Sequence, residues 1–195
     1  MFTLLFFDDF YLHQRTNLSR HVGQPILLRE GTLHDPHVDP AWGYPTVFQD
    51  RESGAWRCVY QGQTADGRFV PVVAESHDGI HWVLPDLAEL IPIRNRLTPH
   101  QLFSVDRFGE WNGPYLDPTA VGTDAWLRAL VVTPGTGTCA LQSLMVTSPD
   151  GLHWSYVDGV PAWHPFGADP ISYMYWNPYR GSHVIATRPS QRTGA

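Results

Sequence analysis

One short loop of the sequence concentrates side chains that could do chemistry. Residues 34–42 have the sequence His-Asp-Pro-His-Val-Asp-Pro-Ala-Trp. Asp35 and Asp39 are carboxylates, a residue type that can act as nucleophile or base. Trp42 offers an apolar ring face on which a ligand ring could stack. A solvated loop with two Asp-Pro turns explains the same residues without any chemistry, so both interpretations are kept.

A metal site is the other chemistry that this loop suggests. His34 and His37 lie beside the two carboxylates, but a proline-rich loop lacks the fixed geometry that zinc ligands usually exploit. We therefore expect no metal and no cofactor. His81 and His153 recur within a repeat and are expected to be structural. The sequence contains no Gly-x-Ser-x-Gly elbow, no P-loop and no dinucleotide-binding fingerprint.

An internal repeat indicates the elements that must position these side chains. Residues 76–82 have the sequence Ser-His-Asp-Gly-Ile-His-Trp, and residues 148–154 have Ser-Pro-Asp-Gly-Leu-His-Trp. Five of the seven positions are identical, and each copy follows an apolar run, at 70–74 and 141–146. Asp-Gly between apolar runs favours a tight turn, because glycine readily adopts positive φ. Each copy therefore predicts two strands joined by a tight turn.

Extending the two copies outward predicts units of four antiparallel strands, as in a β-propeller blade. The first unit covers about 44–86, with strands expected at 45–50, 55–60, 69–76 and from 81 onward. The second covers about 113–157, with strands expected at 114–117, 125–132, 139–148 and around 154. The third covers about 171–195 and supplies two strands, at 171–176 and 182–188.

The expected fold is all-β: a single propeller-type domain over 1–195 with about two and a half four-stranded blades. The 17 glycines and 17 prolines, and the absence of a sustained 3.6-residue period, favour many short strands. Propellers typically have four to eight blades, so two and a half blades cannot close a ring and an incomplete propeller is expected. An open assembly that closes with a second copy, and a small sandwich of similar hairpins, remain alternatives.

The charge and composition of the chain limit the kinds of partner that it is expected to bind. A formal net charge of -6 argues against nucleic acid, whose binding needs a positive patch. Cys58 and Cys139 are too few for a disulfide framework and are expected to be buried free thiols. The start of the sequence lacks the basic region of a signal peptide, and no run approaches the roughly 20 apolar residues of a membrane span. The sequence thus predicts a soluble protein, cytoplasmic by default, with no membrane partner.

The repeat segments 74–82 and 147–154, together with 5–10 and 175–181, resemble a known family. They are similar to the five-bladed β-propellers of glycoside hydrolase families 32 and 43, which include invertase-like and arabinanase-like enzymes. The resemblance covers nearly the whole chain, as the first half of such a protein. The Asp box of sialidase propellers is a poorer match, because it has one more residue between Asp and Gly.

The resemblance implies catalytic carboxylates on the inner strands of different blades, facing a central funnel. Asp117, in Leu-Asp-Pro, is similar to the aspartate that steadies the transition state in the invertase-like enzymes, although Leu116 stands where they have arginine. Asp39 or Asp35 would be nucleophile or base. The third unit, where a general acid is expected, has no carboxylate in 171–176. The remaining acids to consider are Asp169, Glu75 and Glu110.

Aromatic and turn residues complete the expected site and its scaffold. Sugar stacking is expected at three tryptophans: Trp42, Trp111 and Trp176. The repeat itself is expected to be scaffold, with Asp78 and Asp150 binding turn amides and with Trp82 and Trp154 packing between blades.

The function expected from these observations is that of a glycoside hydrolase-like, carbohydrate-active protein that hydrolyses or binds glycans. Whether it is an enzyme is left open, with a glycosidase-like hydrolase favoured. One alternative is a noncatalytic propeller fragment that binds carbohydrate or protein. Another is self-association, in which an open blade edge pairs with a second chain by strand addition.

Overall fold

The computed structural model describes residues 16–17, 19, 21, 23–27, 33–39, 43–104, 111–134, 141–158 and 172–187. Within these ranges the chain forms nine strands in three antiparallel sheets and no helix, so the predicted all-β class is confirmed. None of the described segments is a helix long and apolar enough to cross a membrane.

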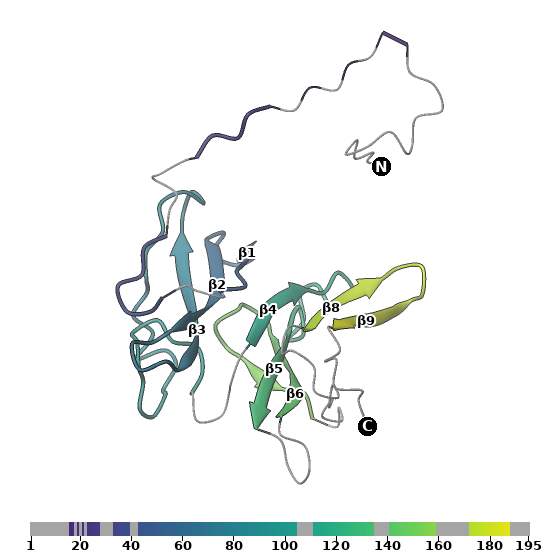
Figure 1. Ribbon diagram of the computed structural model, residues 1–195. Coiled ribbons are helices and arrows are strands. Elements are labelled where there is room, and N and C mark those ends of the chain that lie inside the picture. The colour runs from purple at the N-terminus through teal and green to yellow at the C-terminus, as the bar shows by residue number, and fades with distance from the viewer. Residues whose placement is uncertain are drawn as a thin grey trace, which may run out of the picture.

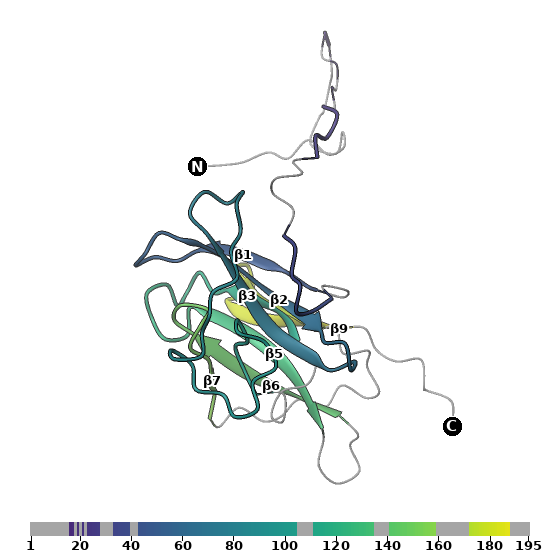
Figure 2. The same cartoon turned by 90° about the vertical axis from the view of Figure 1, so that its left-hand side faces the viewer.

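Each sheet is a meander whose strands follow the order of the chain. The first sheet contains β1 (Thr46–Gln49), β2 (Trp56–Gln63) and β3 (Phe69–Ser76). The second contains β4 (Trp111–Leu116), β5 (Leu127–Pro134), β6 (Leu141–Ser148) and β7 (Ser155–Tyr156). The third is the hairpin of β8 (Ser172–Asn177) and β9 (Ser182–Thr187). The green second sheet lies between the blue first sheet and the yellow hairpin (Figure 1), and the view turned by 90° shows the first two sheets stacked (Figure 2).

The strands lie within a few residues of their predicted positions, with one exception. The fourth strand predicted for the first unit is wrong: after the Asp-Gly turn the chain makes only an isolated bridge, in which Val83 and Glu75 exchange two hydrogen bonds of 2.8 Å. Pro85, two residues later, has no amide hydrogen with which to extend the ladder. The described sheets therefore have three, four and two strands, and they close no barrel.

The two copies of the repeat form the same hydrogen-bonded turn. In each copy the serine hydroxyl accepts the glycine amide, at 2.9 Å in the first and 2.8 Å in the second. The aspartate Oδ1 accepts the two amides that follow the glycine, and its Oδ2 pairs with the histidine Nδ1. Gly79 and Gly151 have φ angles of 75° and 83°, which favour glycine. The prediction that Asp78 and Asp150 bind turn amides is confirmed.

The first two sheets share one buried core. Val59 and Val73 of the first sheet pack in the same cluster as Trp111 of the second. Phe48 of β1 covers the turn of the second repeat, where a Cβ on Gly151 would come 2.4 Å from the ring atom Cζ. The repeat glycine therefore serves both its own turn and the contact between the sheets.

A second apolar cluster lies on the opposite face of the first sheet. It contains Tyr60 and Val72, and Trp82 packs against it, whereas Trp154 packs against the shared core. Cys58 belongs to this second cluster as a buried free thiol, as predicted, and burial raises its pKa to about 11. Cys139 lies outside the described residues.

The first strands of the two large sheets approach closely at Gly113. The register of β4 shifts between Asn112 and Tyr115, and the Thr46 hydroxyl donates to the main-chain oxygen of Pro114 at 2.7 Å. A Cβ on Gly113 would come 2.4 Å from the main-chain oxygen of Tyr44. No side chain fits between β1 and β4 at this point.

Replacing Gly113 with alanine should lower the free energy of unfolding by about 1–3 kcal/mol, the usual cost of overpacking. The matched control is Gly23→Ala, because no heavy atom lies within 4 Å of a Cβ at Gly23. Urea unfolding of both variants measures the difference. Equal stabilities would contradict the close contact between β1 and β4.

Candidate functional site

Asp35 lies in a buried network rather than in a solvated loop. Its Oδ2 accepts the Tyr60 hydroxyl at 2.5 Å and pairs with His100 Nε2 at 2.8 Å, and its Oδ1 accepts the His37 amide at 2.8 Å. The side chains of Asp35 and His100 are 1% and 0% exposed. The His100 Nδ1 is buried with no hydrogen-bond partner.

These contacts fix the ionisation of the network. Burial alone would raise the pKa of Asp35, but the hydrogen bonds from His100, Tyr60 and the His37 amide outweigh it and lower the pKa to about 2. Burial, with the hydrogen bond to this carboxylate, raises the pKa of Tyr60. Asp35 is thus an ionised acceptor that ties residues 33–39 to the first sheet.

The side chain of Asp39 is exposed, and its main chain lies beside the end of β2. Its main chain exchanges two hydrogen bonds of 2.8 Å with Gln63, the last residue of that strand. Tyr44, just before β1, has a φ of 40°, a left-handed conformation that is uncommon for a residue with a side chain. Trp42, predicted as a sugar-stacking residue, lies outside the described residues.

Asp117 is fully buried and accepts four hydrogen bonds. Its Oδ1 binds the amide and hydroxyl of Thr119 at 2.8 and 2.7 Å. Its Oδ2 accepts Arg128 Nε at 2.7 Å and meets His183 Nε2 at 2.8 Å. Although burial opposes ionisation, these donors hold the pKa of Asp117 well below its usual range. The carboxylate joins the second sheet to the third.

The three units repeat this arrangement at the end of their first strands. A polar residue at or just after the end of each strand binds the following turn. A basic residue of the next strand sits opposite the position two before it in the first two units and one before it in the third. The three pairs, in chain order, are Asp50 with Arg57, Asp117 with Arg128, and Asn177 with His183. The sequence analysis missed this relation. The signal available was a strand-ending Asp or Asn followed by an Arg or His at the start of the next strand.

Two of the predicted catalytic carboxylates, Asp35 and Asp117, belong to networks on different faces of the first sheet. Asp35 binds Tyr60, which belongs to the cluster on the outer face of the first sheet. Asp117 follows β4 in the second sheet, which packs on the other face through Val59 and Val73. The first sheet itself therefore lies between Asp35 and Asp117.

The remaining predicted residues have varied surroundings. Trp111 is fully buried and packs edge-on against Phe103 and Trp154, with ring centroids 5.2 and 5.0 Å away. Trp176 is half-buried, 5.1 Å from the His183 ring. Glu75 pairs with Arg57 at 2.8 Å. Two acids named in the sequence analysis, Glu110 and Asp169, lie outside the described residues.

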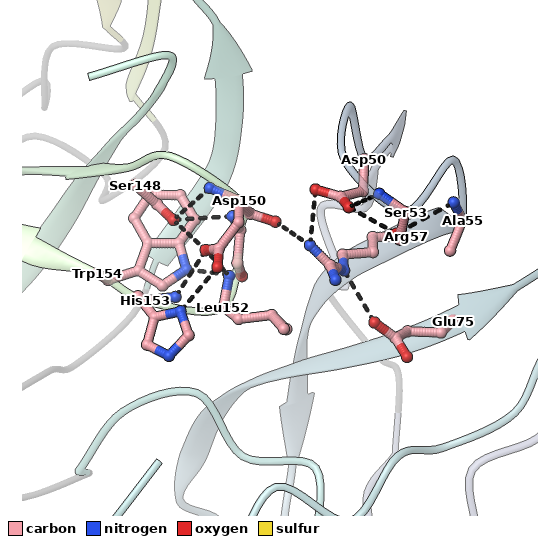
Figure 3. Close-up of polar contacts among 11 residues, drawn as sticks. Asp50, Ser53, Ala55, Arg57, Glu75, Ser148, Asp150, Leu152, His153 and Trp154 are labelled. Atoms are coloured by element: carbon pink, nitrogen blue, oxygen red, sulfur yellow. Dashed lines mark hydrogen bonds and ion pairs between the residues drawn. The ribbon is translucent and has the colours of Figure 1, made fainter. Parts of the chain in front are cut away.

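Arg57 connects the first sheet to the repeat turn of the second. Figure 3 shows its guanidinium between Asp50, Glu75 and the main chain of Asp150. The Nη1 atom lies 3.0 Å from Asp50 Oδ1 and donates to the main-chain oxygen of Asp150 at 2.7 Å. The side chain is 10% exposed, so these bonds are shielded from water.

An aromatic groove of about 520 Å³ opens between two segments far apart in sequence. Trp154 and Tyr156 come from the outermost part of the second sheet, and Phe103 comes from the segment that follows the first. The complete lining is Pro92, Ile93, Arg94, Leu102, Phe103, Ser104, Trp154, Ser155 and Tyr156. The sequence analysis missed this groove, although a spacing of two places Trp154 and Tyr156 on one face of any extended segment.

Arg96 organises the segment that forms one wall of the groove. Its guanidinium donates to the main-chain oxygens of Pro99, Gln101 and Leu87 at 2.9, 3.0 and 3.1 Å, and also to that of Ile91. A single cation thus satisfies carbonyl groups along a loop without regular structure, where unpaired groups would be costly.

A second cavity, of about 450 Å³, lies at the turns joining the first two sheets. Its lining is rich in acids, with Glu52 and Asp124 beside Asp50 and Asp150, and Arg51 is its one basic residue. The described residues nonetheless contain no group of three or more His, Cys, Asp or Glu placed to hold a metal ion.

Comparisons with known proteins identify no family and no related structure for this chain. No family model matches the sequence, and neither curated proteins nor solved structures give a significant match.

The Asp35 network should stabilise the fold above pH 4. The pKa of Asp35 falls from 3.8 to about 2 on folding, so its contribution is present above pH 3.8 and is lost as the pH falls to about 2. Between pH 4 and pH 2 the wild type should lose about 2 kcal/mol more stability than Asp35→Asn. Urea unfolding at each pH measures this, with Asp124→Asn, an exposed turn residue, as control. Parallel losses in wild type and Asp35→Asn would contradict the assignment.

Proposed function

We propose that this chain is a propeller-type domain that binds glycans through the aromatic groove. The observation that carries the proposal is the combination of Phe103, Trp154 and Tyr156 with serine hydroxyls in one opening of about 520 Å³. Aromatic faces pack against the apolar faces of sugar rings, and a few polar groups fix their orientation. The volume falls within the usual range for small-ligand sites, roughly 300–1,000 Å³.

Contacts between successive first strands support the propeller arrangement. β4 contacts β1 and β2, and β8 contacts β4 and β5, so the first strand of each later unit lies beside the first two strands of the unit before it. Inner strands around a propeller axis follow one another in the same way. The recurring strand-end residues and the two repeat turns, which share their serine and aspartate hydrogen bonds, fit blades built from one pattern.

We favour glycan binding over a hydrolytic mechanism that uses Asp35 and Asp117. Both carboxylates are buried and accept several hydrogen bonds. A general acid or nucleophile must reach the substrate, and two of them must lie within roughly 10 Å. The intervening first sheet separates this pair.

Hydrolysis centred on Asp39 is the second candidate. The observation that favours it is an exposed carboxylate at the end of β2, near the left-handed Tyr44 and in the segment anchored by Asp35. Unusual backbone conformations cluster at functional sites because the surrounding structure must hold them. In this candidate Asp39 is the nucleophile or base, and Asp35 positions the segment that carries it.

Self-association by strand addition stays a prediction for the third sheet. Among the described strands β9 pairs with β8 alone, which leaves one edge of the hairpin open. Tyr173 and Tyr175 are 46% and 45% exposed on one face of this hairpin. A second copy of the chain is the partner that this prediction names.

Removing the Tyr156 ring should weaken glycan binding at least tenfold, because the stacking surface is lost. The matched control is Tyr175→Ala, an exposed tyrosine on β8 outside the groove. Tryptophan fluorescence titration with neutral and acidic oligosaccharides provides the readout, since Trp154 lines the groove. No binding by the wild type, or unchanged binding by a folded Tyr156→Ala protein, would overturn the proposal.

If Asp39 is catalytic, Asp39→Asn should lower kcat for oligosaccharide hydrolysis by about 10²–10⁴-fold, the usual contribution of such a group. Asp66→Asn is the control, because Asp66 is exposed on the turn between β2 and β3. A reducing-sugar assay measures the rate. Absence of hydrolysis by the wild type, or an equal rate in Asp39→Asn, would refute this candidate and leave the binding proposal standing.

A further inference from the structure

Arg94 gives the aromatic groove a positive charge. It is the one charged side chain among the nine residues that line the groove. The side chain is exposed, and no carboxylate of the described chain pairs with its guanidinium. Its five N–H groups are therefore available to a ligand.

Three other arginines of the described chain pair with carboxylates within the protein: Arg57, Arg68 and Arg128. Arg57 pairs with Asp50 and Glu75, and Arg128 pairs with Asp117. The formal net charge of the whole protein is -6, so a local cation beside an aromatic wall contrasts with the rest of the surface. The second cavity, lined by several acids, has the opposite character.

We propose that the groove binds an acidic sugar, a hexuronate residue of a glycan. The guanidinium of Arg94 binds the sugar carboxylate, because its planar fork matches a carboxylate through two parallel hydrogen bonds. Tyr156 and Trp154 receive the ring, and the hydroxyls of Ser104 and Ser155 bind sugar hydroxyls. This inference rests on the proposed glycan-binding function and adds the chemical class of its ligand.

Matched pairs of acidic and neutral oligosaccharides test the inference. The probes are trigalacturonate with trigalactose, and trimannuronate with trimannose, titrated against the full chain by tryptophan fluorescence. At least one acidic probe should bind ten or more times tighter than its neutral partner. Raising the salt from 50 to 500 mM should weaken acidic binding and leave neutral binding unchanged.

The variant Arg94→Gln should remove the preference for the acidic probe. The control Arg180→Gln, at an exposed arginine between β8 and β9, should retain it. Two results overturn the inference and leave the glycan-binding function standing. The first is that the wild type binds neutral probes as tightly as acidic ones. The second is that a folded Arg94→Gln protein keeps the preference for the acidic probe. Failure of the wild type to bind any probe overturns both the inference and that function. Circular dichroism confirms that each variant is folded.

Discussion

The contact between the first sheet and the repeat turn of the second holds this structure together. Arg57 donates to the main-chain oxygen of Asp150, and Phe48 lies over the glycine that follows it. One polar bond and one close apolar contact thus fix the same turn. Because the turn joins β6 to the chain leading into β7, this contact sets the position of the whole second sheet, and with it the shared core and one wall of the aromatic groove.

Two buried carboxylates of the described chain join segments that are distant in sequence. Asp35 reaches His100, 65 residues away, and Asp117 reaches His183, 66 residues away. An ionised carboxylate inside a protein is costly unless several donors surround it, and both aspartates meet this condition. Side chains that suggest catalysis from their sequence motifs are therefore engaged here in holding sheets and loops together.

The aromatic groove depends on the same arrangement. One wall comes from the segment that crosses the edge of β3, where the Leu102 amide donates to the main-chain oxygen of Pro71. The other comes from the end of the second sheet. Arg96 keeps the first wall ordered by binding its carbonyl groups, and Trp154 is anchored by its own hydrogen bond to the Gly151 oxygen. The groove is therefore a property of two packed units, and a single repeat does not contain it.

The sequence alone determined the all-β class, the places of nearly all the strands and the role of Asp78 and Asp150, because these depend on alternating apolar residues and on hydrogen bonds spanning three residues or fewer. The tertiary structure decided the loss of the fourth strand in the first unit, the burial of Asp35 and Trp111, and the separation of Asp35 from Asp117 by a sheet. It also decided the aromatic groove. These features arise from contacts between residues far apart in the chain, such as the 93 positions between Arg57 and Asp150, and such contacts leave no periodic pattern in the local sequence.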